Sequence, residues 1–459
     1  MRARPYLRWK HFRAAALLCL FPAALGTVAT TRAQSPQPQE PAHVTLQLDA
    51  VSRAEVAEKF AEALATDYAY ADRGAKMAAA IRAKVNAKAY DGITSPSEFA
   101  NALERDARAV VDDRHLEVDF NSEPAQMPRG GPSREMMSEM RRQNAGIPQV
   151  KILDGNIGYI VVNGMLPDSA AKDAITAAFA FLRYTDALIL DLRGNPGGSG
   201  SIDLYMSYLS TGAPYLLHSV HWRSGLVVDT RTMDLGALSY GTKKPVFLLT
   251  SHRTFSAAEA LAYDFQSCKR GMVVGETTGG GANPSVWDGT ASLGHGFFAN
   301  IPTGYVVNAF TGGNWEGLGV KPDVEVSADE ALAKAWSLAL VRVSANATNT
   351  QTRTFLEALS SAKLDGEPTL SSAQLVGRYA SKSGDPTILI TQNNGKLCGH
   401  ESYADGEAAD MIFRPLGGDR YAPVGFPDGF SLTFAEKDGT IELVQLRPPP
   451  MDSSLLQKQ

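Results

Sequence analysis

The chain has 459 residues, which is long enough for two or three domains with a sizeable core. It carries 44 Lys and Arg residues against 49 Asp and Glu residues, a formal net charge of −5 at pH 7. This acidic balance argues against nucleic acid and anionic membrane surfaces as partners, because both attract basic proteins.

The first 33 residues have the pattern of a secretory signal peptide. A basic start precedes a short apolar stretch at residues 14–25, and residues 31–33 fit a small-x-small cleavage site. The apolar stretch is too short to span a bilayer, and no later run approaches that length. We therefore expect an exported protein, periplasmic or secreted, without stable membrane insertion. Removal of residues 1–33, which hold six Lys and Arg and no Asp or Glu, would change the formal charge from −5 to −11.

Residues 44–125 are expected to form a helical N-terminal subdomain. Residues 95–98, Ser-Pro-Ser-Glu, are a strong helix start with proline at the first helical position. This helix should end near Val111, and the alternating residues 116–120 predict a strand after it. His115 is therefore expected at a helix-to-strand junction, where a side chain can project into a cleft.

Residues 121–148 are polar but contain Met136, Met137 and Met140. Methionines at such spacing usually fill gaps in a core. The alternative is that segment 127–140 forms a flexible cover over a cleft.

The middle of the chain alternates between strand and helix patterns. Strands are predicted at residues 157–164, 187–194, 245–251 and 272–276, and helices at 169–182, near Asp203 and from Ser256. Such alternation is typical of a parallel, layered α/β core, which we place at residues 149–330.

The character of the chain changes after this core. Residues 331–345 predict a helix, and residues 346–368 a largely polar connection. Short strand-like runs separated by Asn-Gly, Gly-Gly and Asp-Gly turns then follow. We interpret residues 371–447 as a separate antiparallel β domain, a small barrel or half-barrel with an accessory role.

Ser256 lies where the strand at 245–251 turns into a helix. A hydroxyl on such a turn is held beside the first free N–H groups of the helix. A nucleophile that generates an oxyanion needs this combination. The alternative is that Ser256 only caps the helix, with Glu259 completing a capping box.

Four further motifs occur in a fixed order: DDRHLEV (112–118), RGNPGGSG (193–200), GETTGGGA (275–282) and NWEGLGV (314–320). With the Ser256 segment they resemble the C-terminal processing (tail-specific) serine peptidases, in their interphotoreceptor retinoid-binding protein-like and tricorn-like branch. The resemblance implies the fold shared by the Clp peptidase and crotonase families. Residues 121–148 are too few for the PDZ domain that many relatives insert there.

The resemblance also implies roles for individual residues. Ser256 would be the nucleophile, and the oxyanion hole would take one N–H from Ala257 and one from Gly197 or Gly198, between which the sequence does not choose. The commonest members use a lysine base, but Gly281 stands at that position. The branch resembled here uses a histidine and a late glutamate, which match His115 and Glu316. Arg114 departs from the helper serine of tricorn-like enzymes.

The remaining histidines are assigned simpler roles. His218 and His221 have the spacing of metal ligands without a third ligand nearby, so we interpret them as packed or solvated side chains. His295, near a predicted strand of the core, is the reserve candidate for the base.

We therefore expect an exported serine peptidase that hydrolyses peptide bonds in polypeptide substrates through an acyl-enzyme, without a metal or organic cofactor. One alternative is a non-catalytic protein that binds a hydrophobic ligand. A second is an esterase that uses the same site.

Overall fold

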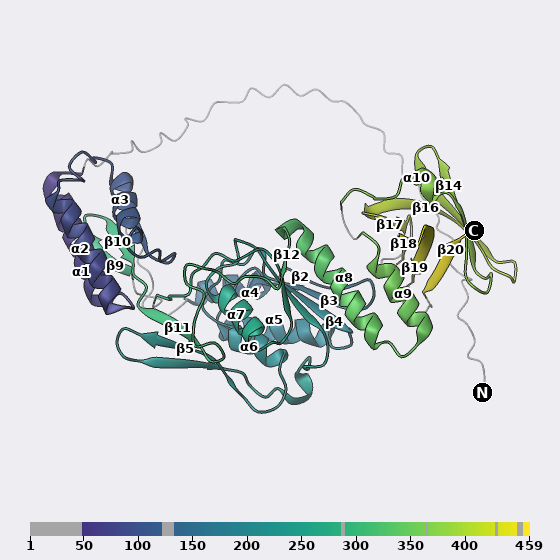
Figure 1. Ribbon diagram of the computed structural model, residues 1–459, viewed down its shortest axis with the longest axis horizontal. Helices are drawn as coiled ribbons and strands as arrows, with labels where there is room; N and C mark the ends of the chain where they lie inside the picture. The colour runs from purple at the N-terminus through teal and green to yellow at the C-terminus, as the bar shows by residue number, and fades with distance from the viewer. Residues whose placement is uncertain (1–47, 122–132, 286–289, 364–365, 427–429, 448–452) are drawn as a thin grey trace, which may run out of the picture. The chain divides into compact units, whose positions relative to one another are not determined.

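The computed structural model describes residues 48–121, 133–285, 290–363, 366–426, 430–447 and 453–459 (Figure 1). The predicted signal peptide and residues 127–132 of the predicted cover lie outside the described residues. The rest of the cover forms helix α4 (Arg134–Arg142), which buries none of its residues, so its methionines are not core. Among the described residues, no helix has both the length and the apolar content needed to cross a membrane.

The N-terminal subdomain contains three helices, α1 (Ala50–Asp67), α2 (Ala71–Asn86) and α3 (Pro96–Arg108). Helix α3 starts as predicted, because the Ser95 side chain accepts a hydrogen bond from the Glu98 N–H. The three helices pack their buried apolar faces together in one cluster.

A small sheet completes this subdomain. Strand β1 (Glu117–Phe120) pairs antiparallel with β10 (Phe297–Asn300), which pairs with β9 (Thr290–Gly294). Phe297 and Leu293 are buried in the same cluster as the helices. The subdomain therefore does not end at the predicted residue 125, because two strands return to it from a distant part of the chain.

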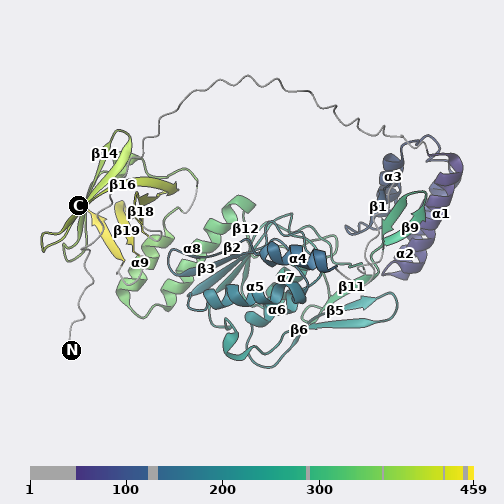
Figure 2. The same cartoon turned by 180° about the vertical axis from the view of Figure 1, so that it is seen from behind.

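The core is a six-stranded sheet in the order β12-β8-β7-β4-β3-β2. All neighbouring pairs are parallel except β2–β3, which is antiparallel at one edge. Helices α5, α6 and α7 pack in one apolar cluster and α8 in another, on the opposite face (Figures 1 and 2). The bounds are β2 (Gln149–Leu153), β3 (Ile157–Val161), α5 (Asp168–Phe181), β4 (Ala187–Asp191), α6 (Ile202–Tyr208), β7 (Val246–Thr250), α7 (Ala257–Ser267), β8 (Met272–Gly275), β12 (Val324–Glu325) and α8 (Ala328–Asn346).

The core also contains a second sheet, with the strand order β11-β5-β6. It contains β5 (Leu216–Trp222), β6 (Val227–Arg231) and β11 (Gly304–Asn308), all antiparallel. The predicted fold class is thus confirmed: a layered α/β core with helices at the N-terminal side and an antiparallel β domain after it. Two 3-10 turns, at Asn144–Gly146 and Gly236–Leu238, complete the central elements.

The connection predicted at 346–368 contains a helix, α9 (Thr350–Ser360). Its Leu356, Ala358 and Leu359 are buried with Trp336 of α8 in the cluster under the sheet. This apolar face is short and polar residues surround it in the sequence. The hydrophobic pattern therefore did not predict the helix.

The C-terminal domain is a closed barrel of eight strands, β13 to β20, that follows the short helix α10 (Ser372–Leu375). The last strand pairs with both β19 and β13 and so closes the barrel. The predicted end at residue 447 is therefore too early. The strands are β13 (Gly377–Ala380), β14 (Thr387–Asn393), β15 (Lys396–Ser402), β16 (Ala408–Gly417), β17 (Arg420–Pro423), β18 (Ser431–Lys437), β19 (Thr440–Leu446) and β20 (Ser454–Lys458).

The packing of α9 predicts where the chain can be shortened. Truncation after Lys363 should leave a cooperatively folding protein, because α9 stays on α8. Truncation after Ala345 should lower the free energy of unfolding by several kcal/mol, since each fully buried leucine contributes roughly 1.5–3 kcal/mol. Urea unfolding of both truncations measures the difference. Equal stabilities would show that α9 does not support the core.

Candidate active site

Ser256 stands on a strained turn between β7 and α7. Its backbone has φ 53° and ψ −122°, a conformation that residues with a side chain rarely adopt. A hydrogen bond to another loop holds the turn: the Phe255 N–H donates to the Asn195 carbonyl at 3.1 Å. Gly197 makes room for it: a Cβ there would lie 2.7 Å from both the Ser256 Cβ and the Phe255 carbonyl oxygen. Strain kept in this way presents the Ser256 hydroxyl in a fixed direction.

His115 meets this hydroxyl. Its Nε2 lies 2.9 Å from Ser256 Oγ, although the two residues are 141 positions apart in the chain. The His115 ring also stacks obliquely on the Phe255 ring, with centroids 4.6 Å apart. The His115 carbonyl accepts a hydrogen bond from Asn300 Nδ2 at 2.7 Å, at the start of the β1–β10 pairing. The structure thus brings together the two residues that the sequence assigned as nucleophile and base.

Asp113 is a residue of this site that sequence reasoning missed. It is fully buried and accepts three hydrogen bonds: from the Tyr68 hydroxyl at 2.8 Å, from Asn283 Nδ2 at 2.9 Å and from the His115 N–H at 3.0 Å. The last of these is an Asx turn, a local bond to the backbone two residues on. The Asp-x-His spacing was therefore the one available signal in the sequence.

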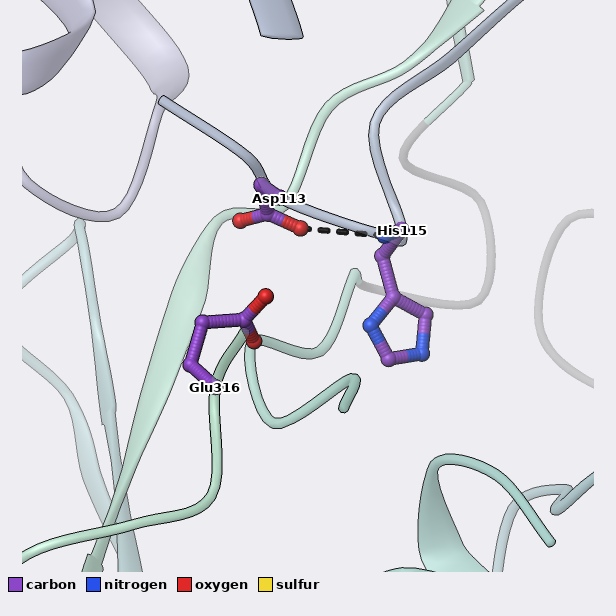
Figure 3. Close-up of side chains that lie close together, drawn as sticks. All are labelled: Asp113, His115 and Glu316. Carbon is purple, nitrogen blue, oxygen red and sulfur yellow. Dashed lines mark hydrogen bonds between the residues drawn. The ribbon is translucent and has the colours of Figure 1, made fainter. Parts of the chain in front are cut away.

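Glu316 lies in the same buried cluster (Figure 3). Its Oε2 accepts hydrogen bonds from the Ala282 N–H at 2.5 Å and the Asn283 N–H at 2.9 Å. The expected hydrogen bond to His115 is not formed: Glu316 Oε1 and His115 Nδ1 are both buried without a partner among the described residues. One side-chain nitrogen or oxygen atom from each of Asp113, His115 and Glu316 nevertheless lies within 4.8 Å of the other two.

The pKa values of Glu316 and His115 are shifted in opposite directions. Burial, together with the neighbouring Asp113 carboxylate, raises the pKa of Glu316 to about 7, although backbone N–H donors oppose this rise. Burial lowers the pKa of His115 below its usual range, with a partial opposing effect of Asp113. His115 is therefore held in the neutral form that can accept a proton.

The glycine-rich loop reaches the nucleophile from β4. The Gly197 N–H donates to Asn195 Oδ1 at 2.9 Å, so it is already engaged. Gly198 forms a parallel bridge with Met165, whose N–H and C=O bond to Gly197 and Ser199. The two hydrogen bonds of that bridge do not use the Gly198 N–H. Ala257, the first residue of α7, directly follows Ser256.

Two sequence profiles match the chain. That of peptidase family S41 matches residues 156–326, and that of the N-terminal domain of peptidase S41 in eukaryotic interphotoreceptor retinoid-binding protein matches residues 46–148. Together they cover more than half of the sequence. The chain belongs to peptidase family S41. Family membership places it among serine-type peptidases, a class of hydrolases.

Individual S41 relatives are distant. The carboxy-terminal processing protease CtpA of Bacillus subtilis (strain 168) is 27% identical over 202 residues, which are 40% of this chain and 42% of that protein. The chain thus matches about two-fifths of the length of this curated relative. A lipoprotein from Streptococcus agalactiae superposes with a TM-score of 0.40 at 18% identity, over 63% of this chain and 96% of that one. The photosystem II D1 C-terminal processing protease gives 0.39 at 13% identity, over 61% and 94%.

The position of the lysine base of the commonest S41 peptidases is closed in this chain. A Cβ on Gly281 would lie 2.3 Å from the Phe255 ring and 2.8 Å from His115 Cε1. The space that a lysine side chain would need is filled by the histidine and by the phenylalanine beside it. The reserve histidine, His295, pairs instead with Glu55 at 2.7 Å.

Two carboxylates of this S41 site, the buried Glu259 and the half-buried Glu316, hold the backbone of residues 280–283. Glu259 accepts from the N–H groups of Gly280 at 2.7 Å and Gly281 at 2.8 Å, and from that of Ser256 at 2.8 Å. Glu316 accepts from the next two N–H groups. Glu259 is thus more than the helix cap expected from the sequence, because it ties the nucleophile turn to this loop.

The other polar residues singled out in the sequence lie outside the cluster around Ser256. His218 is buried and pairs with Asp264 at 2.7 Å, and His221 stacks on Tyr305. Both are packed side chains, as expected. Arg114 forms an ion pair with Asp112 at 3.5 Å.

The Tyr68 contact generates a prediction for the S41 site. Tyr68→Phe removes one donor from a buried carboxylate, which should lower the free energy of unfolding by about 1–3 kcal/mol. It should also lower kcat more than it changes KM, because Asp113 positions His115. Denaturant unfolding and steady-state kinetics measure both, with Tyr184→Phe, an exposed tyrosine, as the matched control. Unchanged kcat in a destabilised variant would mean that Tyr68 supports only the fold.

Proposed function

We propose that the chain is an exported serine peptidase that processes polypeptides, with Ser256 as nucleophile, His115 as base and Glu316 as the carboxylate that supports the base. The observation that carries this proposal is the 2.9 Å contact between His115 Nε2 and Ser256 Oγ on a strained strand-to-helix turn. Neutral imidazole in hydrogen-bond reach of a serine is the arrangement that activates a hydroxyl.

Acylation follows from this geometry. Ser256 Oγ attacks the scissile carbonyl carbon while its proton moves to His115 Nε2. The imidazolium then gives that proton to the leaving amine, and the acyl group stays on Ser256. Water attacks the ester with His115 again as base, which releases the acid and restores the serine.

The oxyanion is stabilised by backbone donors. Ala257 supplies the N–H that follows the nucleophile, and Gly198 supplies the second, because Gly197 already donates to Asn195. Donors fixed in the folded chain need no reorganisation when the charge develops.

Glu316 supports the base through its unpartnered oxygen. The reactive tautomer carries its proton on Nδ1, and Glu316 Oε1 is the nearby buried acceptor without a partner in the described part of the chain. The backbone N–H groups of Ala282 and Asn283 fix the other oxygen, which leaves Oε1 free to accept from the ring beside it (Figure 3). A small movement of either side chain closes the hydrogen bond as the ring becomes charged.

The substrate class and the location rest on weaker similarities. The name of the Bacillus relative supports carboxy-terminal processing as the activity, and the pattern of residues 1–33 supports export to the periplasm or the medium. An esterase would use the same acyl-enzyme, whereas a binding protein would have no need for a strained serine next to a neutral histidine.

Ser256→Ala should abolish hydrolysis of an unfolded protein such as casein and labelling by a fluorophosphonate probe, without unfolding the protein. His115→Gln should lower kcat/KM on the order of a thousandfold or more. Gly92→Ala, at an open surface position, is the matched control and should change neither. Turnover of casein by purified Ser256→Ala would refute the proposed nucleophile.

The pKa of Glu316, raised to about 7, predicts a pH-dependent effect of Glu316→Gln. At about pH 6 Glu316 is largely protonated, and a neutral carboxyl resembles the amide that replaces it. At about pH 8 it is ionised and stabilises the imidazolium. The ratio of kcat/KM between variant and wild type should therefore fall by on the order of tenfold or more from pH 6 to pH 8. A ratio independent of pH would exclude this role.

A further inference from the structure

The cluster around His115 carries more negative than positive charge. Asp113 and Glu316 both lie close to His115, and no Lys or Arg among the described residues forms an ion pair with either carboxylate. The nearest guanidinium, Arg108, is engaged by Glu104 at 2.8 Å and by the backbone carbonyls of Asp113 and Arg114. The buried Asp113 and the half-buried Glu316 therefore lie close to one imidazole, without a basic side chain paired to either carboxylate.

Three buried polar atoms of this cluster and of the neighbouring Asn283 have no hydrogen-bond partner in the described structure. They are His115 Nδ1, Glu316 Oε1 and Asn283 Oδ1. Asn283 is itself fully buried, and it contacts both carboxylates through its side-chain and backbone N–H groups. Buried polar atoms without a hydrogen-bond partner are rare because they cost free energy. Each of the three therefore indicates a bound partner.

We propose that Asp113, His115 and Glu316 form an inhibitory site for a divalent transition-metal ion, with Zn²⁺ as the ion of best fit. The inference rests on the proposed function, because it concerns regulation of the same base. One imidazole nitrogen with two carboxylates is a ligand set for Zn²⁺ or Co²⁺, whereas Ca²⁺ and Mg²⁺ prefer oxygen ligands alone. The metal has no part in the hydrolytic mechanism.

The geometry requires a small contraction of the site. The three ligand atoms now lie within 4.8 Å of one another, as Figure 3 illustrates. Ligands at about 2.0–2.2 Å from a tetrahedral ion stand about 3.4 Å apart. Each therefore moves by on the order of an ångström, which the side chain of Glu316 and the loop of His115 can supply.

Metal binding would stop His115 from acting as the base, because it changes which ring nitrogen carries the proton. The Nδ1 lone pair goes to the metal, so the ring proton leaves Nδ1 and resides on Nε2. Nε2 then has no lone pair to accept the proton of Ser256 Oγ. The contraction also draws the ring away from Ser256. Zn²⁺ would thus switch the enzyme off without touching the nucleophile or the oxyanion donors.

The first test uses the full purified chain after treatment with EDTA. Added Zn²⁺ should reduce both casein hydrolysis and the rate of fluorophosphonate labelling, EDTA should restore them, and equal Mg²⁺ or Ca²⁺ should have no effect. Glu316→Gln should raise the half-inhibitory Zn²⁺ concentration on the order of tenfold or more, since even outer-shell partners of a metal change affinity by about 10–100-fold. His400→Gln, which removes an exposed histidine paired with Asp410, should leave Zn²⁺ inhibition unchanged.

The second test reads binding without activity. In equilibrium dialysis, Ser256→Ala should bind one more Zn²⁺ per chain than the double variant Ser256→Ala/Glu316→Gln, with circular dichroism to verify that both are folded. If wild type is inactive while this difference persists, the proposed function fails and the metal site stands. Equal Zn²⁺ binding by the two proteins, or inhibition of equal strength in Glu316→Gln, would overturn the metal site.

Discussion

The hydrogen bond between His115 and Ser256 is the contact on which this site depends, and neither residue can secure it alone. Ser256 belongs to the α/β core, whereas His115 follows the last helix of the N-terminal subdomain. Their separation of 141 residues is closed by the pairing of β1 with β10, which carries the His115 segment to the core. Loss of that pairing would leave a strained serine without a base.

Two carboxylates fix the remaining geometry. Four consecutive N–H groups, those of residues 280–283, are taken in pairs by Glu259 and Glu316. These four hydrogen bonds hold the loop in place. Removing either carboxylate leaves at least two donors unsatisfied, which costs more free energy than the hydrogen bonds contribute when formed. The site around His115 thus depends on hydrogen bonds of the backbone as well as on side-chain contacts.

Local patterns predicted much of the core and the position of Ser256, because β3, β4 and β7 are each a short apolar run followed by a turn and a helix. His115 and Glu316 needed the family resemblance, since nothing near them in sequence indicates that they meet. Asp113 could not be identified, because its partners Tyr68 and Asn283 are 45 and 170 residues away. Two other features also join residues that are far apart in sequence: the return of β9 and β10 to the N-terminal subdomain, and the closure of the barrel by β20. The hydrophobic periodicity of a single segment does not indicate such contacts.

The return of β9 and β10 has a consequence for biosynthesis. A nascent chain of about 285 residues already contains the three helices, Ser256 and His115, yet it lacks Phe297, which fills the core between those helices. The N-terminal subdomain therefore cannot complete its packing by the usual order of domain after domain as the chain emerges. Base and nucleophile come together only after the ribosome has passed residue 300. Under the proposed function, a partly made chain therefore lacks a complete site.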